Sequence, residues 1–474
     1  MNIYVLLIFI FSFQISCERK FLIDQHAKTP SHLKKANAKL KTPNKATQQT
    51  ITSTLQLKKS DQQLFNENLC DVFLAAGIPL SKVNDTHLKC FLQQYTKFNI
   101  PDESCLRRKY VDVCYDQAIA EIRQIIGDNY FSFVVDESTD ARGRYIAHLM
   151  IVTLSESAPN KCFLVASKQL EKTNNLSITR FVQEELTRFF VPGNFSPNKC
   201  LLMLSDSASY MVKSATNLKI FYGNLINVTC LAHALNLVAE EIRRNFPNVN
   251  DLINCVKKVF VKAPLRVQFY KEHLPNIPLP PMPVVTRWGT WLEAAFFYAE
   301  HFSDIKSVIL DLSDEGCSAL QESKRLLKLN DLPQKLSFIA TNYRFVPKSI
   351  EKLESQDLLL TESVDIINQF EKCLQKVKGK IGESILQKFN YVLGKNHGFS
   401  LLKKVAKVHG GATVDDFHLD PILVQKLKYA PITSVDVERS FSIYKHLYTD
   451  RKHSFLVENF EKHLVVKCFK NNIK

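Results

Sequence analysis

Residues 131–140 have the sequence FSFVVDESTD, which predicts a short β-strand that ends in carboxylates. Successive side chains of a strand point to opposite faces, so Phe131 and Phe133 share one face while Val134 and Asp136 share the other. An aspartate at the end of an apolar strand is costly to remove from water unless another group pairs with it. Asp136 is therefore the first candidate for a functional site.

The segments around this strand predict an α/β domain. Further strands are expected at 145–154, 162–167, 199–206 and 227–230, and the one at 199–206 should be buried. An amphipathic helix is expected at 177–190, and a helix should follow each of the last two strands. The order β-β-β-α-β-α-β-α is that of an RNase H-like fold, in which the first and fourth strands are neighbours. This topology would bring Asp206, at the end of the fourth strand, next to Asp136.

A third carboxylate comes from the segment YAPITSVDVERSFSIYKHL near the end of the chain. It predicts a helix from about Ser434 that carries Glu438, with Thr433 and Asp436 spaced as in a capping box. We expect Asp136, Asp206 and Glu438 to meet over one sheet and to hold Mg²⁺ or Mn²⁺. The alternative is that all three are surface or capping acids.

The chemistry that such a set would serve follows from its ligands. Hard divalent cations prefer carboxylate oxygens and keep open positions for water and phosphate. Two such ions can activate a water or a 3′-hydroxyl and stabilise the leaving oxygen of a phosphodiester. Without metal, three converging carboxylates raise one another's pKa.

The composition is compatible with a nucleic-acid partner. The chain has 474 residues, 45% of them hydrophobic, which is enough for two to four domains. Its formal charge is +15 with a pI of about 9.1, which favours a polyanionic partner or, equally, a solvated basic surface. Its 12 cysteines are scattered without a CxxC pair, as expected for reduced thiols inside a cell.

The expected organisation has six parts. These are a signal-like apolar segment at 1–17, a basic linker with half of a zinc finger at 18–60, a small helical region at 61–127, the first part of the α/β core at 128–292, an all-helical insertion at 293–427, and the second part of the core at 428–474.

The first two parts carry ambiguous signals. The apolar run at 3–13 resembles a secretory signal but lacks a positively charged start, so a start foreign to the ancestral domain is favoured over secretion. It is also too short to span a bilayer, which takes roughly 20 residues. His26 and His32 have the spacing of the histidine half of a zinc finger, but the cysteine half is missing.

Five motifs make the chain, from about Asn66 to Phe469, resemble the hAT superfamily of DNA transposases. They are VVDESTD (134–140), LSDSASYMVK (204–213), CLAHALNLV (230–238), TRWGTW (286–291) and APITSVDVERSFS (430–442). The resemblance implies an RNase H-like catalytic domain split by a helical insertion, with a DDE triad at Asp136, Asp206 and Glu438. Glu137 and Asp140 are rivals for the first place, and Asp136 is preferred because it is closest to the apolar strand.

The same resemblance implies roles for residues outside the triad. His233 would lie near the scissile phosphate, and Trp288, beside Arg287, would stack on a displaced base. The competing interpretations are a packed, hydrogen-bonded histidine and a tryptophan in a core or connector. In the family an N-terminal BED-type finger binds DNA, of which only the His26 and His32 half is present.

The end of the chain resembles the family's dimerisation region. Its apolar stripe, formed by Leu456, Phe460, Leu464 and Val465, recurs at helical spacing and must cover a core or a partner. A homodimer or higher oligomer through these C-terminal helices is expected, and packing on the chain's own domain is the alternative.

The sequence thus predicts a transposon-derived, hAT-like nuclear protein that binds DNA, has no membrane association, and carries a two-metal site for DNA strand cleavage and transfer. The alternative is a domesticated, catalytically inactive scaffold that binds DNA or protein as a dimer.

Overall fold

The computed structural model describes residues 59–190, 196–284, 289–313, 316–415, 417–448 and 457–472. The signal-like segment, the His26 and His32 pair, Arg287 and Trp288 lie outside these residues, so the expectations for them stay predictions. The chain divides into two units, Met1–Leu64 and Phe65–Lys474, and the architecture below is that of the second.

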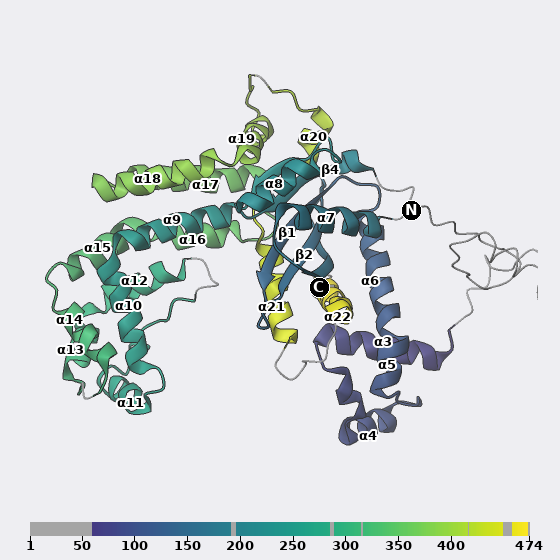
Figure 1. Ribbon diagram of the computed structural model, residues 1–474, viewed down its shortest axis with the longest axis horizontal. Coiled ribbons are helices and arrows are strands. Elements are labelled where there is room, and N and C mark those ends of the chain that lie inside the picture. Colours follow the sequence, from purple (N-terminus) through teal and green to yellow (C-terminus); the bar gives the residue numbers. More distant parts are fainter. Residues whose placement is uncertain are drawn as a thin grey trace, which may run out of the picture. The chain divides into compact units, whose positions relative to one another are not determined.

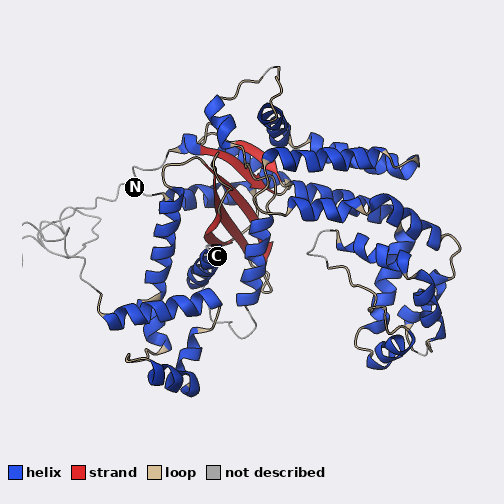
Figure 2. Ribbon diagram, turned by 180° about the vertical axis from the view of Figure 1, so that it is seen from behind, coloured by secondary structure: helices blue, strands red, loops and turns tan. Residues whose placement is uncertain are grey.

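A five-stranded mixed sheet forms the centre of this unit (Figures 1 and 2), and the expected mixed α/β architecture is confirmed. Its strands are β1 (Phe131–Thr139), β2 (Tyr145–Thr153), β3 (Cys162–Leu170), β4 (Cys200–Ser205) and β5 (Ile226–Thr229). The strand order is β3-β2-β1-β4-β5. β1, β2 and β3 are antiparallel neighbours, whereas β4 and β5 run parallel to β1.

The register of the sheet explains where its polar residues lie. Every residue of β4 is buried, as its continuous apolar sequence predicts, and Asp206 follows directly at the strand's end. β1 is buried from Phe131 to Asp136, which pairs with His148 of β2. Because β1 and β4 are parallel neighbours, Asp136 and Asp206 lie toward the same end of the sheet, at the carboxyl ends of these strands.

Helices precede the sheet in the order α3 (Asp61–Ala76), η1 (Leu80–Asn84), α4 (Thr86–Tyr95), α5 (Glu103–Lys109) and α6 (Val111–Ile126). The small helical region expected at 61–127 thus contains several short helices, of which α5 and α6 meet at Tyr110. The Tyr110 backbone departs from helical geometry with φ −116°, and its hydroxyl accepts a hydrogen bond from Asn66 Nδ2 of α3 at 3.1 Å. A tertiary contact therefore fixes this break.

Helices α7 (Asn175–Phe189), α8 (Ser209–Leu218) and α9 (Leu231–Asn245) connect and follow the later strands. The remaining helices before the last segment are α10 (Pro247–Phe260), α11 (Pro264–His273), α12 (Thr290–Glu300), α13 (Phe302–Asp311), α14 (Ser318–Leu327), α15 (Leu332–Tyr343), α16 (Phe345–Leu353), α17 (Leu360–Gln375), α18 (Gly379–Gly394), α19 (His397–His409) and α20 (Pro421–Lys426). Within this group α10 packs on α14, and α12 packs on α15.

The described ranges also bear on two expectations from composition. None of their helices combines the length and apolar character that crossing a membrane requires. Their eleven cysteines form no disulfide.

The last two helices are α21 (Val435–Leu447) and α22 (Val457–Asn472), and α22 corrects the expectation for the C-terminal stripe. α22 packs against β3 and α6 (Figure 1), and Phe460, Leu464 and Val465 are buried there. The stripe is therefore covered by the chain's own core, which was the alternative interpretation. It is not a free surface for a second copy, and Leu456 lies outside the described residues.

Both edges of the sheet are met by side chains from helices. At β5, the side-chain amide of Asn396 donates to the Thr229 carbonyl at 2.7 Å and accepts from the Thr229 N–H at 3.2 Å. Gly398 lies against the same strand, since a Cβ there would stand 2.7 Å from the Asn227 carbonyl carbon. At β3, the Ser167 N–H donates to Glu461 Oε1 of α22 at 3.2 Å.

Candidate active site at the ends of β1 and β4

Asp136 is the most deeply buried acid of the predicted triad. Its side chain sits at the end of the buried part of β1, and the residue is 7% exposed. Its own Oδ1 accepts a hydrogen bond from the Glu137 N–H at 2.9 Å. Burial raises the pKa of Asp136 well above its usual range because the charged carboxylate loses its water.

The other two predicted carboxylates act on Asp136 electrostatically. After burial, the charge of Glu438 is the next cause that raises the Asp136 pKa, and the charge of Asp206 raises it as well. Like charges affect one another in this way only when they lie near each other. The pairing of β1 with β4 puts Asp136 and Asp206 at the same end of the sheet, and Glu438 of α21 acts on the same buried carboxyl group.

His233 is the positive counterpart of this acidic group. It lies in the first turn of α9, and its Nε2 is 3.7 Å from Glu438 Oε1. Burial lowers the pKa of His233, but its hydrogen bond with Cys230 and the charges of Cys230, Asp136 and Glu438 outweigh that effect and raise it to about 9. His233 thus stands among the acids as a cation, and it lowers the pKa of Asp136.

A short hydrogen-bonded chain links His233 to the start of α21. The Ser434 N–H donates to Cys230 Sγ at 3.2 Å, and Ser434 Oγ lies 3.4 Å from His233 Nδ1. Ser434 is the N-cap of α21, but its side chain makes no capping bond, so the capping box predicted from Thr433 and Asp436 was wrong. The Ser434 hydroxyl instead faces α9, which fixes the end of α21 that carries Glu438.

His148 ties α21 to the sheet from the other side. Its Nδ1 lies 2.7 Å from Ser440 Oγ, and its ring stacks on Phe441 with centroids 3.9 Å apart. Ser440 Oγ donates to the Val437 carbonyl at 2.6 Å, so Nδ1 of His148 must be the donor in the pair. Sequence reasoning missed His148, because nothing in the strand sequence marks its partner 292 residues away.

This buried histidine predicts an acid-sensitive fold. Burial lowers the pKa of His148 to about 3 from an ordinary 6.5, so the unfolded chain binds this proton first as the pH falls. The stabilisation of the fold by neutral His148 is therefore complete above about pH 6.5. It is lost as the pH falls toward 3, at about 1.4 kcal/mol of unfolding free energy per pH unit. His148→Gln should flatten the pH dependence of the unfolding free energy by about one proton in urea titrations between about pH 5.5 and 4, between the unfolded and folded pKa values. An unchanged slope would contradict the assignment.

The two rival carboxylates have other partners. Asp140 forms an ion pair with Arg144 at 2.7 Å and accepts a hydrogen bond from the Tyr444 hydroxyl at 3.3 Å. Although burial raises the Asp140 pKa, the hydrogen bonds from Arg144 and the Arg142 N–H lower it below its usual value. Asp140 is therefore committed to holding the β1–β2 turn.

Glu137, unlike Asp140, interacts with a member of the predicted triad. Its Oε1 accepts from the Tyr210 hydroxyl of α8 at 2.9 Å, and its pKa is raised by burial and by the charge of Asp206. Burial, the hydrogen bond to Glu137 and nearby acidic charges also raise the pKa of Tyr210. Tyr210 was not predicted as a site residue, although it lies within the LSDSASYMVK motif.

The donor set fits a hard divalent cation in kind, because all three predicted ligands are carboxylates and the charges of two of them raise the pKa of Asp136. The arrangement is not a formed metal centre: across the described ranges, no group of three or more His, Cys, Asp and Glu side chains is placed to hold a metal ion. The cation that faces Glu438 within the described ranges is His233.

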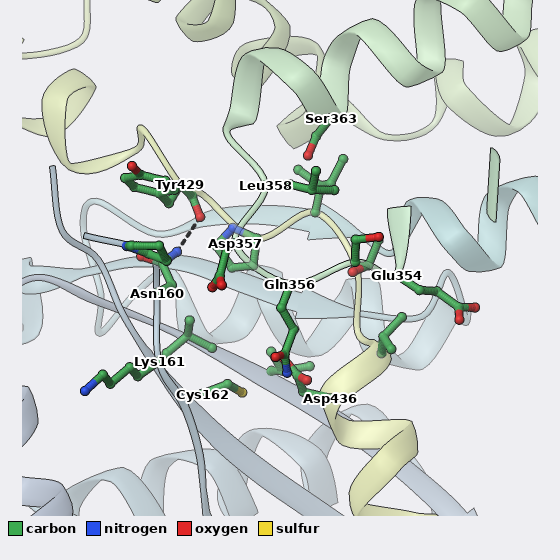
Figure 3. A pocket seen from close by; sticks show the side chains of 18 of the residues that line it. Asn160, Lys161, Cys162, Glu354, Gln356, Asp357, Leu358, Ser363, Tyr429 and Asp436 are labelled. Carbon is green, nitrogen blue, oxygen red and sulfur yellow. Dashed lines mark hydrogen bonds between the residues drawn. The ribbon is translucent and has the colours of Figure 1, made fainter. Parts of the chain in front are cut away.

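A cavity of about 520 Å³ opens on another side of α21 (Figure 3). Asp436 and Arg439 line it and form an ion pair at 2.9 Å, and Arg439 also donates to the Glu354 carbonyl at 3.1 Å. Asp136, Asp206, His233 and Glu438 do not line it. The cavity is therefore separate from the acidic group, and its polar wall holds the same helix in place.

Comparison with known proteins shows that part of this region is similar to a family without an assigned role. Residues 101–263, which include Asp136, Asp206 and His233, match the family model described as a domain of unknown function, DUF659. No curated protein matches the chain. The chain is thus similar to the DUF659 domain over the segment that runs from α5 through β1–β5 to the end of α10.

Proposed function

We propose that this chain is a hAT transposase-like, transposon-derived protein that binds DNA and carries a DDE site for metal-dependent strand cleavage and transfer. The observation that carries the proposal is the parallel pairing of β1 and β4, which puts Asp136 and Asp206 at the same end of the sheet, and the charges of Asp206 and Glu438 both raise the pKa of Asp136. These acids lie 70 and 302 residues from Asp136 in the sequence, yet they affect the ionisation of one buried carboxylate.

The topology supports the same proposal. The strand order β3-β2-β1-β4-β5, with three antiparallel strands followed by two parallel ones, agrees with an RNase H-like fold. In open α/β sheets, sites form outside the carboxyl ends of the strands, which is where Asp136 and Asp206 lie. A fold alone does not imply a function, so the proposal depends on the site residues.

Each residue has a role in the proposed site. Asp136, Asp206 and Glu438 would hold the Mg²⁺ or Mn²⁺ ions. When bound, such ions supply an activated oxygen nucleophile and stabilise the leaving oxygen. His233 is suited to contact the scissile phosphate because it is positively charged and already lies 3.7 Å from Glu438. His148 and Ser434 hold α21 and so position Glu438.

A second candidate function is a catalytically inactive scaffold that binds DNA or protein. The His233–Glu438 pair favours it, because a cation of the chain itself occupies the position next to one of the three proposed ligands. A nuclear location and a homodimer belong to both candidates as proposals. Any dimer must use a surface other than the buried α22 stripe.

Metal-linked stability tests the first candidate. Mg²⁺ or Mn²⁺ at about 100 times its dissociation constant should stabilise the fold by roughly 2.7 kcal/mol. Asp136→Asn combined with Asp206→Asn should abolish that gain. The double variant should also be more stable than wild type in EDTA, because a folded-state pKa raised above its ordinary value means that the charged Asp136 destabilises the fold at neutral pH.

Thermal or urea unfolding with and without metal measures both the stabilisation by metal and the stability of each protein in EDTA. A matched control is Glu171→Gln with Glu383→Gln, which removes two charges from exposed acids elsewhere. If the Asp136 and Asp206 variant keeps the wild-type response to metal, the shared site is wrong.

A further inference from the structure

Helices α18 and α19 carry a concentration of positive charge that the acidic site does not explain. Residues 376–409 contain eight lysines and a single acid, Glu383, a net +7 out of the chain's +15. From 384 to 414 no acidic residue occurs. A solvated helix face usually mixes both signs, and like charges at i and i+4, such as Lys403 and Lys407, weaken a helix.

One face of α18 orders this charge into a stripe. Ile385 and Phe389 are buried where α18 packs on α9 and α17, and one flank of the helix carries Lys380, Ser384, Lys388, Tyr391 and Lys395, of which Ser384 and Lys388 are half-buried and the other three are exposed. These five residues, here called the α18 stripe, are spaced by three or four positions and so line one side of the helix. Figure 1 shows α18 beside α17 with α9 next to them.

Tyr391 is the aromatic centre of the α18 stripe. It is 58% exposed, although large aromatic side chains are usually covered. Lys395 Nζ lies 4.1 Å from the ring centroid and bonds the Tyr391 hydroxyl, and Lys388 Nζ lies 5.8 Å from the same ring. The hydrogen bond and charge of Lys395 also lower the pKa of Tyr391. A flat ring is thus presented to solvent between two ammonium groups.

The dimensions of the stripe match a nucleic-acid strand. Lys388 and Lys395 are seven residues apart, which is about 10 Å along a helix. A stacked strand has one phosphate about every 3.4 Å, so two such lysines can contact phosphates about three nucleotides apart. The ring between them is placed to stack on an intervening base. An acidic peptide offers the charges but no regularly spaced ring for Tyr391.

We infer that the α18 stripe is a binding surface for a single nucleic-acid strand, in which Lys380, Lys388 and Lys395 contact phosphates and Tyr391 stacks on a base. The surface adds a second contact to the DNA-binding function proposed above. It does not depend on the carboxylate group, because it rests on charge and exposure on other helices.

Fluorescence anisotropy on the full chain in EDTA tests the inference with oligo-dT and oligo-rU of about 15 nucleotides and with a duplex of the same length. Tyr391→Ala should weaken binding of the single strands by about 5- to 150-fold and leave duplex binding unchanged. Lys388→Gln with Lys395→Gln should weaken binding and reduce the slope of log K against log salt by about 1.4 for the single strands. Unequal dT and rU affinities would identify the preferred backbone.

The matched control is Lys172→Gln with Lys258→Gln, which removes the same charge from exposed lysines elsewhere. Equal losses in the control and in the stripe variant, or single-strand binding that Tyr391→Ala leaves unchanged, would overturn the inference. So would competition by polyglutamate as effective as that by oligo-dT, because it would assign the surface to acidic protein. These assays are run in EDTA and report on strand binding alone, whereas metal-linked unfolding reports on the carboxylate group, so a failed cleavage site and a failed stripe give different results.

Discussion

Glu438→Gln is expected to abolish Mn²⁺-dependent nicking of DNA while leaving DNA binding intact. The substitution preserves the size and helix propensity of the side chain but removes the charge that couples to Asp136. Metal ligation supplies several kcal/mol of transition-state stabilisation, and a loss of about 3 kcal/mol slows a reaction about 100-fold or more. Single-turnover nicking of a supercoiled plasmid measures the rate.

The control for this variant is Glu458→Gln, an exposed acid in the first turn of α22. It should nick at the wild-type rate. Equal nicking by Glu438→Gln and wild type would show that Glu438 is misassigned. Inert wild-type protein would instead favour the scaffold function, and the metal-linked unfolding experiment would then show whether the carboxylates still bind metal.

Phe460→Asp is expected to unfold the chain. The Phe460 ring is 3% exposed and packs against Tyr444 and Tyr448, with centroids 4.8 and 5.6 Å away. Removing a buried phenylalanine costs about 3–5 kcal/mol, and burying an unpaired carboxylate adds to that cost. The total is comparable with the whole stability of a domain, about 5–15 kcal/mol. Leu464→Asp, at a fully buried position of the same helix, should also unfold the chain.

Circular dichroism and sedimentation distinguish the two interpretations of the α22 stripe. Asn459→Asp adds the same charge at the neighbouring exposed position and should leave the fold and its melting temperature intact. A Phe460→Asp protein that stays folded but sediments as a smaller species than wild type would mean that the stripe is an interface after all.

The strands could be predicted because their signals are local. β4 is apolar throughout and β1 ends in an acid, and these two facts with the order of the elements were enough to place Asp136 beside Asp206. The helix carrying Glu438 was found in the same way. The expected ends of the strands differ from the observed ones by a few residues at most, and the largest difference is at β3, which strand pairing extends from the expected 167 to Leu170.

What the sequence did not predict depends on contacts between distant residues. The break at Tyr110 follows from Asn66, and the orientation of Ser434 follows from Cys230 and His233. Helical spacing shows that α22 has an apolar face, but it does not distinguish a core from a partner, because both cover such a face equally well. The couplings of His148 and Tyr210 to the site are likewise invisible before folding.

The side chains at the two sheet edges have a consequence for aggregation. An unprotected edge strand offers free N–H and C=O groups to which another chain can add a strand, the first step of edge-to-edge aggregation. The side-chain amide of Asn396 hydrogen-bonds both the N–H and the C=O of Thr229, and Gly398 lets α19 lie directly on β5. At the opposite edge, Glu461 takes the Ser167 N–H. At these positions the sheet offers no template for a growing fibril, and a mutation that displaces α19 or α22 would expose one.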